Sequence, residues 1–228
     1  MRRRAASLAL TFQVLAAAAA AGSSGDGRLE ALRAAAPDLD PRVLELALTA
    51  HRSAAREGLL ARPGVLAVID YSLPSTEPRL WVLDLESPKL LFRELVAHGV
   101  GTGENRSRRF SNRKGSKQSS LGLFATGETY RGRNGYSLRL HGLEKGVNDL
   151  AFDRAIVMHG AWYVSEAFAR DHGRLGRSWG CPAVRDGISR ELIDRIRGGS
   201  ALFAFFPDQD WLASSRFLSS SIASGASP

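Results

Sequence analysis

Hydrophobic positions follow two different periods along this chain, and the change comes near Gly64. Before it, small and branched apolar residues recur at three- and four-residue intervals, at Val43, Ala47, Ala50 and Ala54. This period is typical of one helix face. Asp40-Pro41 supplies an N-cap and a first-turn proline, so the helix is expected to begin there and to run until Gly58 stops it. A shorter alanine-rich helix is predicted at Arg28–Ala36.

After Gly64 the chain consists of short β-rich runs separated by turn residues. These predict strands at Val65–Leu73, Arg79–Leu85, Leu121–Thr126, Tyr136–Leu140, Ala155–His159 and Ala201–Phe206. Gly132–Gly135 is a turn signal between two of them. Helices are predicted within Ser165–His172 and at Ile188–Arg197, and the serine-rich tail from Ser214 is predicted to be disordered. The fold class is therefore mainly β with embedded helices.

The first residues have the composition of a secretory signal. Three arginines, Arg2 to Arg4, precede an alanine-heavy apolar run that ends in small residues before Gly22. We expect a signal peptide at 1–21, a helical N-terminal segment at 22–63, one main domain, large enough to hold a catalytic site, at 64–207 and a C-terminal tail at 208–228. The protein would then be exported or periplasmic with no stable membrane anchor. An uncleaved anchor helix is the alternative, although polar residues interrupt the apolar run.

The chain is basic, with a formal net charge of +8 that falls to +5 when the three signal arginines are removed. This charge favours anionic partners such as cell-wall peptides or membrane surfaces. It does not indicate nucleic acid, because we find neither a basic recognition helix nor an aromatic-rich platform. Much of the charge lies in a loop between Gly101 and Ser120, which carries Arg106, Arg108, Arg109, Arg113, Lys114 and Lys117. Both a solvated loop and a lid that attracts substrate carboxylates fit this composition.

The only cysteine, Cys181, stands between Gly180 and Pro182. An exported chain with one cysteine cannot form an internal disulfide, so the thiol is either a small buried apolar residue or a nucleophile. A nucleophilic thiol needs a base, and His159, after an apolar run, is the candidate. The backbone carbonyl of Gly160 can orient its second ring nitrogen. Because Pro182 has no amide hydrogen, the amides of Gly180 and Cys181 are the expected oxyanion donors.

A resemblance extends well beyond the cysteine, over six segments. They are Val96–Gly103, Thr126–Tyr130, Gly135–Leu140, Gly142–Glu144 with Asn148-Asp149, Ile156–Gly160 and Ser178–Ala183. Together they resemble the L,D-transpeptidase (YkuD-type) catalytic domain family, in particular its murein L,D-transpeptidase branch. The resemblance covers Gly64 to Pro207 and implies a YkuD-like β-sandwich. It also implies a strand at Lys89–Val100, a run whose period alone fits a helix equally well.

The resemblance assigns roles to residues of this chain. Cys181 would be the acyl-accepting nucleophile and His159 the base, while the nucleophile loop would include Ser178 and Gly180. The side chains expected to bind substrate are Ser178, Trp179, His141 and Tyr163. Packing is the alternative for the tyrosine, and a core position is the alternative for Trp179 and its counterpart Trp162.

The nucleophile loop departs from the better-known branch of the family at two positions. That branch has a histidine before the glycine and an arginine two places after the cysteine, where this chain has Trp179 and Ala183. The roles of those two side chains are therefore not carried over, and Arg185 is not taken as a substitute for the arginine.

By the resemblance, the protein would join peptidoglycan stem peptides through a cysteine thioester and would be acylated by carbapenems. An L,D-carboxypeptidase or endopeptidase, which uses water as the acceptor, is one alternative, and a non-catalytic peptidoglycan-binding module is another. A zinc hydrolase would need a site made from His141, His159, His172 and Cys181. No pair of these has the close spacing typical of metal motifs, so we predict no metal and no cofactor.

Overall fold

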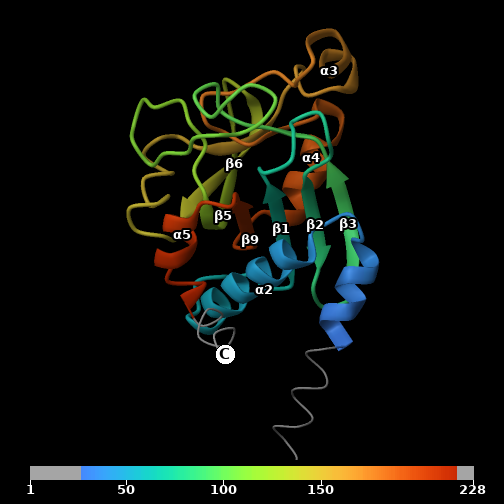
Figure 1. Cartoon of the computed structure of the whole chain (residues 1–228), viewed down its shortest axis with the longest axis vertical. Coiled ribbons are helices and arrows are strands. Elements are labelled where there is room, and N and C mark those ends of the chain that lie inside the picture. Colours follow the sequence, from blue (N-terminus) through green and yellow to red (C-terminus); the bar gives the residue numbers. More distant parts are fainter. Residues whose placement is uncertain (1–26, 220–228) are drawn as a thin grey trace, which may run out of the picture.

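The computed structural model describes residues 27–219 (Figure 1), so the predicted signal peptide and the end of the tail lie outside the described residues. Within them, nine strands form one mixed sheet in the order β3-β2-β1-β9-β5-β6-β7-β8-β4. The strands are β1 (Val65–Asp70), β2 (Leu80–Asp84), β3 (Lys89–Glu94), β4 (Val96–Ala97), β5 (Gly122–Gly132), β6 (Gly135–Gly142), β7 (Val157–Gly160), β8 (Ala183–Val184) and β9 (Ala201–Phe205).

The sheet closes on itself through a single residue. β3 and β4 stand at opposite ends of the strand order, yet only Leu95 separates them in the chain. The sheet therefore curls until its two edges meet, and side chains from its inner surface fill a common core. The predicted fold class, mainly β with embedded helices, is confirmed.

Buried strands in the middle of the order form the core. All residues of β1 and β9, which pair in parallel, are buried, as expected for strands covered on both faces. The helix α2 (Pro41–Arg56) packs against these two strands (Figure 1). Its predicted apolar face is confirmed, and the Asp40 carboxylate caps it by accepting from the Arg42 amide at 2.7 Å. No helix in the described part of the chain is long and apolar enough to cross a membrane.

A helix also covers residues 27–35, before α2. Three further helices lie in the second half of the chain: α3 (Glu166–His172), α4 (Asp186–Ile196) and α5 (Gln209–Ser214). The α3 helix lies within its predicted range, and α4 begins two residues before its predicted start. The sequence did not predict α5 or the two-residue strand β8, which is too short to show a period.

Two predictions about irregular regions have different outcomes. The Lys89–Val100 run is a strand, as predicted, although Leu95 divides it into β3 and β4. The prediction of a disordered tail from Ser214 is wrong for residues 215–219. Phe217 and Leu218 are both buried in the main core, because these apolar side chains anchor an otherwise serine-rich segment.

Candidate active site

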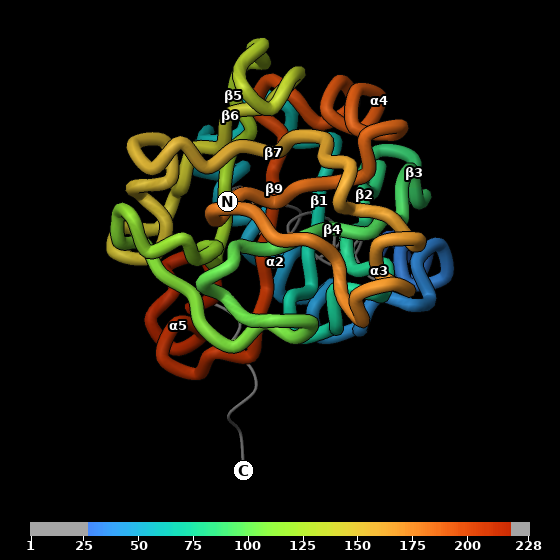
Figure 2. The backbone as a smooth tube through the Cα atoms, turned by 90° about the horizontal axis from the view of Figure 1, so that it is seen from above, coloured from blue at the N-terminus to red at the C-terminus, as the bar shows by residue number. Residues whose placement is uncertain are grey.

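The nucleophile loop, residues 178–181, is held by backbone and hydroxyl hydrogen bonds. The Ser178 amide donates to the His98 carbonyl at 3.0 Å, and the Val100 amide donates to the Ser178 carbonyl at 2.8 Å. The Ser178 hydroxyl donates to the Cys181 carbonyl at 2.6 Å and accepts from the Gly180 amide at 3.1 Å. These bonds tie the loop to the segment after β4 (Figure 2). Ser178 therefore shapes the loop from within.

This arrangement corrects one expectation from the sequence. Because the Gly180 amide is occupied by the Ser178 hydroxyl, it is not free to bind an oxyanion. The amide of Cys181 makes no hydrogen bond within residues 27–219 and remains the candidate donor of the predicted pair. Gly180 has φ +125°, and a Cβ there would lie 2.8 Å from the Gln118 carbonyl oxygen. Its glycine is required by backbone conformation and by close packing.

Cys181 and His159 come from neighbouring segments of the sheet. The strands β7 and β8 are parallel, with His159 opposite Ala183. Cys181 lies two residues before β8, next to Val157 of β7. The Val157 amide donates to the Cys181 Sγ at 3.5 Å, and the thiol is directed at the Ala155 carbonyl at 3.6 Å.

The imidazole of His159 has a fixed tautomer. Its Nδ1 lies 2.8 Å from the Gly160 carbonyl oxygen, the hydrogen bond predicted from the sequence. A carbonyl can only accept, so Nδ1 carries the proton and Nε2 of the neutral ring has a free lone pair. The arrangement provides a base without a carboxylate bonded to the ring.

Burial keeps both groups neutral. It raises the pKa of the Cys181 thiol, although the Val157 amide and the nearby Arg154 guanidinium oppose this. Burial also lowers the pKa of His159, and the Gly160 carbonyl and the Asp186 carboxylate partly offset it. Near neutral pH the free site therefore holds a thiol and a neutral imidazole rather than an ion pair.

The other predicted site residues differ in position. Burial raises the pKa of Tyr163 to about 12, and the Cys181 charge adds to this, so the phenol lies within electrostatic reach of the thiol. Trp179 is 72% exposed, and the Lys117 ammonium lies 5.1 Å from its ring centre. Trp162 is 74% exposed, so neither tryptophan occupies the core. His141, on β6, faces the same side of the sheet as His159, but its imidazole is stacked on an aromatic ring.

That ring belongs to Phe152, whose centroid lies 5.2 Å from that of the His141 imidazole. The His141 Nε2 also lies 3.9 Å from a Glu128 carboxylate oxygen. The imidazole is therefore engaged away from the thiol. No three His, Cys, Asp or Glu side chains converge in a metal-binding group anywhere in residues 27–219.

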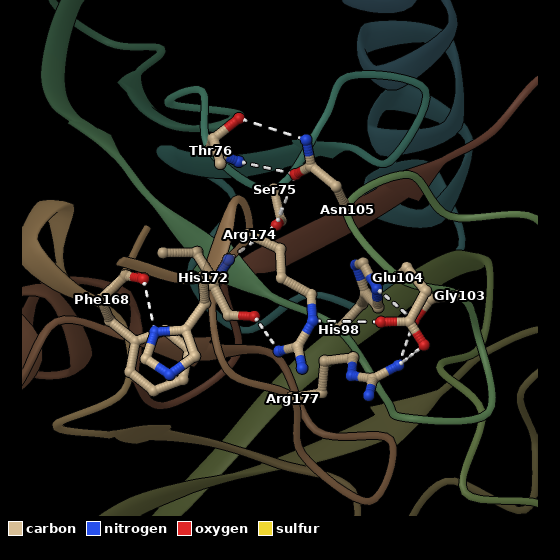
Figure 3. Close-up of polar contacts among 11 residues, drawn as sticks. Ser75, Thr76, His98, Gly103, Glu104, Asn105, Phe168, His172, Arg174 and Arg177 are labelled. Atoms are coloured by element: carbon tan, nitrogen blue, oxygen red, sulfur yellow. Dashed lines mark hydrogen bonds and ion pairs between the residues drawn. The ribbon is translucent and has the colours of Figure 1, made fainter. Parts of the chain in front are cut away.

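The basic loop between Gly101 and Ser120 borders the nucleophile loop. The Ser119 hydroxyl donates to the Gly180 carbonyl at 3.0 Å and accepts from the Gly99 amide at 3.0 Å. Close to its start, Glu104 binds the guanidinium groups of Arg174 and Arg177 (Figure 3). Both ends of the loop are therefore anchored, and Ser119 holds it against Gly180.

Sequence reasoning missed Arg154 and Asp186 near the site and assigned no role to His98. Arg154 contacts the basic loop, as described below, and nothing in its sequence context marks it. Asp186 begins α4, and its carboxylate lies so close to Gly160 that a Cβ there would be 2.6 Å from Oδ1. His98 is buried beside the guanidinium of Arg79, whose Nη2 donates to its Nδ1 at 2.7 Å. Only the fold brings these groups together.

Arg185 has a structural partner. Its guanidinium forms two hydrogen bonds with the buried Glu94 carboxylate, at 2.8 and 2.7 Å. These bonds raise the pKa of Arg185. The side chain is therefore occupied at the edge of the sheet, in agreement with leaving it out of the catalytic set.

Comparison with known proteins identifies the family. Residues 35–205 match the L,D-transpeptidase catalytic domain family. The chain belongs to this family. The match begins before α2, so the helix that packs on β1 and β9 falls within the family's domain, whereas the resemblance in the sequence began at Gly64.

Solved structures of L,D-transpeptidases are also similar to this chain, at low sequence identity. An enzyme from Mycobacterium smegmatis is 14% identical over 63% of this chain and 59% of its own, with a TM-score of 0.39. The helical cell shape determining protein Pgp2 from Campylobacter jejuni is 12% identical over 64% and 48%, with a TM-score of 0.41. LdtMt1 in complex with imipenem is 13% identical over 62% and 59%, with a TM-score of 0.38. No curated protein matches the chain.

Proposed function

We propose that this protein is a peptidoglycan L,D-transpeptidase that cross-links stem peptides through a thioester on Cys181. The observation that carries the proposal is the His159 tautomer, in which the Gly160 carbonyl holds Nδ1 and leaves Nε2 unprotonated, on a strand that pairs with the segment following Cys181. Membership of the L,D-transpeptidase catalytic domain family supports the same chemistry.

In the first half-reaction the His159 Nε2 accepts the thiol proton while Sγ attacks the carbonyl of the third residue of a tetrapeptide stem. The Cys181 amide donates to the oxyanion that develops on this carbonyl. When the tetrahedral intermediate collapses, the C–N bond to the terminal D-alanine breaks. The imidazolium returns its proton to the leaving amine, and a thioester remains.

The second half-reaction reverses these roles. The amine of a neighbouring stem attacks the thioester carbonyl, and His159 accepts a proton from it. The C–S bond then breaks, the thiol recovers its proton and the cross-linked product leaves. No cofactor takes part in this scheme. Carbapenems would acylate the same thiol by opening their β-lactam ring.

The basic loop is proposed to attract the anionic substrate to an exported enzyme. A hollow of about 470 Å³ is lined by Arg106, Arg108 and Arg109, and also by Glu104. The nearby Glu104 carboxylate is already paired with Arg174 and Arg177, so it does not neutralise these three. Stem peptides carry several carboxylates, and we expect binding to weaken as ionic strength rises.

Hydrolysis is the second candidate function, because Trp162 and Trp179 are too exposed to shield the thioester from water. Water in place of the acceptor amine would make the protein an L,D-carboxypeptidase or endopeptidase. A non-catalytic peptidoglycan-binding module would retain the groove without turnover.

Mass spectrometry of purified tetrapeptide muropeptides, incubated with the protein or with Cys181→Ala, separates these functions. Transpeptidation gives dimers that lack one D-alanine, only with the wild-type thiol. Trimmed monomers alone would identify a hydrolase. Binding that survives Cys181→Ala, with no product from either protein, would identify a binding module.

A further inference from the structure

One guanidinium holds the part of the basic loop that faces the nucleophile. Arg154 lies three residues before the start of β7 and donates to four acceptors of this loop. Its Nη1 contacts the Ser111 carbonyl and the Ser120 hydroxyl at 2.5 Å each. Its Nη2 contacts the Gln118 carbonyl at 2.6 Å and the Ser116 hydroxyl at 3.2 Å. Both nitrogens of the planar fork are used, a geometry that lysine cannot reproduce.

The loop atoms that Arg154 holds are next to the atoms that pack on Gly180. The Gln118 carbonyl oxygen would lie 2.8 Å from a Cβ on Gly180, and the following Ser119 hydroxyl donates to the Gly180 carbonyl at 3.0 Å. Displacement of Gln118 would therefore change the packing around the residue that precedes Cys181.

The residue after Arg154 contacts Cys181. Ala155 has φ +54°, a left-handed conformation that is unfavourable for a residue with a Cβ. Its carbonyl is nevertheless directed at the Cys181 Sγ, at 3.6 Å. Arg154 thus binds the loop with its side chain, while the next residue contacts the thiol with its carbonyl.

We propose that Arg154 is a positioning residue that clamps the Ser111–Ser120 segment against the nucleophile loop and places a positive charge beside the Cys181 thiol. A cation in that place stabilises the thiolate, which the buried site otherwise disfavours.

The other titratable groups that face the thiol do not supply this charge. Burial raises the pKa of Cys181, and the Arg154 guanidinium opposes this; burial lowers the pKa of Arg154, and the Cys181 thiolate opposes that. Tyr71 and Tyr163 also interact with the Cys181 charge. Burial raises the pKa of each to about 12, so both phenols are neutral near pH 7. Burial lowers the pKa of His159, so the imidazole is neutral as well.

Alkylation tests the electrostatic part of this inference without any peptidoglycan substrate. Cys181 is the only cysteine, so the intact mass after iodoacetamide treatment reports on this thiol alone. The alkylation rate is measured from pH 5 to 10 for the wild type, Arg154→Gln, Arg154→Lys and Arg113→Gln. Arg113 is the matched control, because it is an exposed arginine of the same loop.

We expect Arg154→Gln to slow alkylation at pH 7.5 about 10-fold, which corresponds to a rise of about one unit in the thiol pKa. Arg154→Lys should keep most of the wild-type profile because it keeps the charge, and Arg113→Gln should match the wild type. A folded Arg154→Gln protein with an unchanged profile would overturn the electrostatic role.

Amide hydrogen exchange tests the clamp separately. Both Arg154 variants should increase the exchange rates of the amides in residues 111–120, since neither side chain can make all four hydrogen bonds. Unchanged exchange in both variants would overturn the clamp. Because neither readout requires turnover, the inference can fail while transpeptidation is confirmed, or hold while transpeptidation is refuted.

Discussion

The backbones of Gly99 and Gly180 are in direct contact, although 81 positions separate them in the chain. A Cβ on Gly99 would lie 2.8 Å from the Gly180 Cα and 2.4 Å from the Lys117 carbonyl oxygen. Three segments, the one after β4, the basic loop and the nucleophile loop, therefore meet at a point where no side chain fits. The position of the Cys181 thiol depends on this contact.

Substitution of Gly99 by alanine should displace the nucleophile loop. We expect Gly99→Ala to lower the free energy of unfolding by about 1–3 kcal/mol and to reduce kcat/KM for acylation by a larger factor than stability alone explains. Chemical denaturation and acylation kinetics measure the two effects. The control is Gly187→Ala, in α4, because a Cβ there has no neighbour within 4 Å and alanine favours helix. Equal acylation rates for both variants would contradict this role of the contact.

The acid limb of the pH profile for acylation should lie below the ordinary histidine range. Attack requires the neutral His159 base, and burial lowers the pKa of this imidazole. Activity should therefore persist below about pH 6.5 and decline only at lower pH. Stopped-flow acylation by a carbapenem measures the profile. A midpoint above 6.5 would instead indicate a preformed thiolate–imidazolium pair.

His98 should make the protein less stable in acid. Burial, with a smaller effect from Arg79, lowers the pKa of His98 to about 4, so the unfolded chain binds a proton more readily than the folded one. The contribution of neutral His98 to the free energy of unfolding is complete above about pH 6.5. As the pH falls toward 4, about 3 kcal/mol of it is lost. Urea unfolding of the wild type and of His98→Gln at several pH values measures this slope. The same slope in both proteins would assign the pH dependence to other groups.

Arg185 should matter for stability and not for chemistry. Arg185→Ala leaves the buried Glu94 carboxylate without its two hydrogen bonds, so the free energy of unfolding should fall by about 2 kcal/mol. Acylation by the folded fraction should be unchanged. Thermal unfolding and active-site titration measure the two quantities, and the variant Glu94→Gln should restore part of the stability on the Arg185→Ala background. Loss of acylation in a folded Arg185→Ala protein would show that this arginine takes part in the reaction.

Much of the fold could be predicted from the local sequence. The face of α2 and the buried strands β1 and β9 follow from hydrophobic periods that depend on neighbouring residues alone. β8 could not be predicted, because two residues show no period, and α5 was hidden in a serine-rich tail. The way the sheet closes at Leu95 depends on pairing between β4 and β8, which lie far apart in the chain.

The sequence by itself indicated the candidate nucleophile and base, because a lone Cys181 and the strand-end His159 have residue types and neighbours that this chemistry needs. It also indicated the Gly160 carbonyl, since the bond to His159 Nδ1 is local. Only the tertiary structure decided that the Gly180 amide is occupied, and that Arg154 reaches across to the basic loop. Hydrogen bonds and charge interactions act across space between residues distant in the chain, so no local pattern of residues records them.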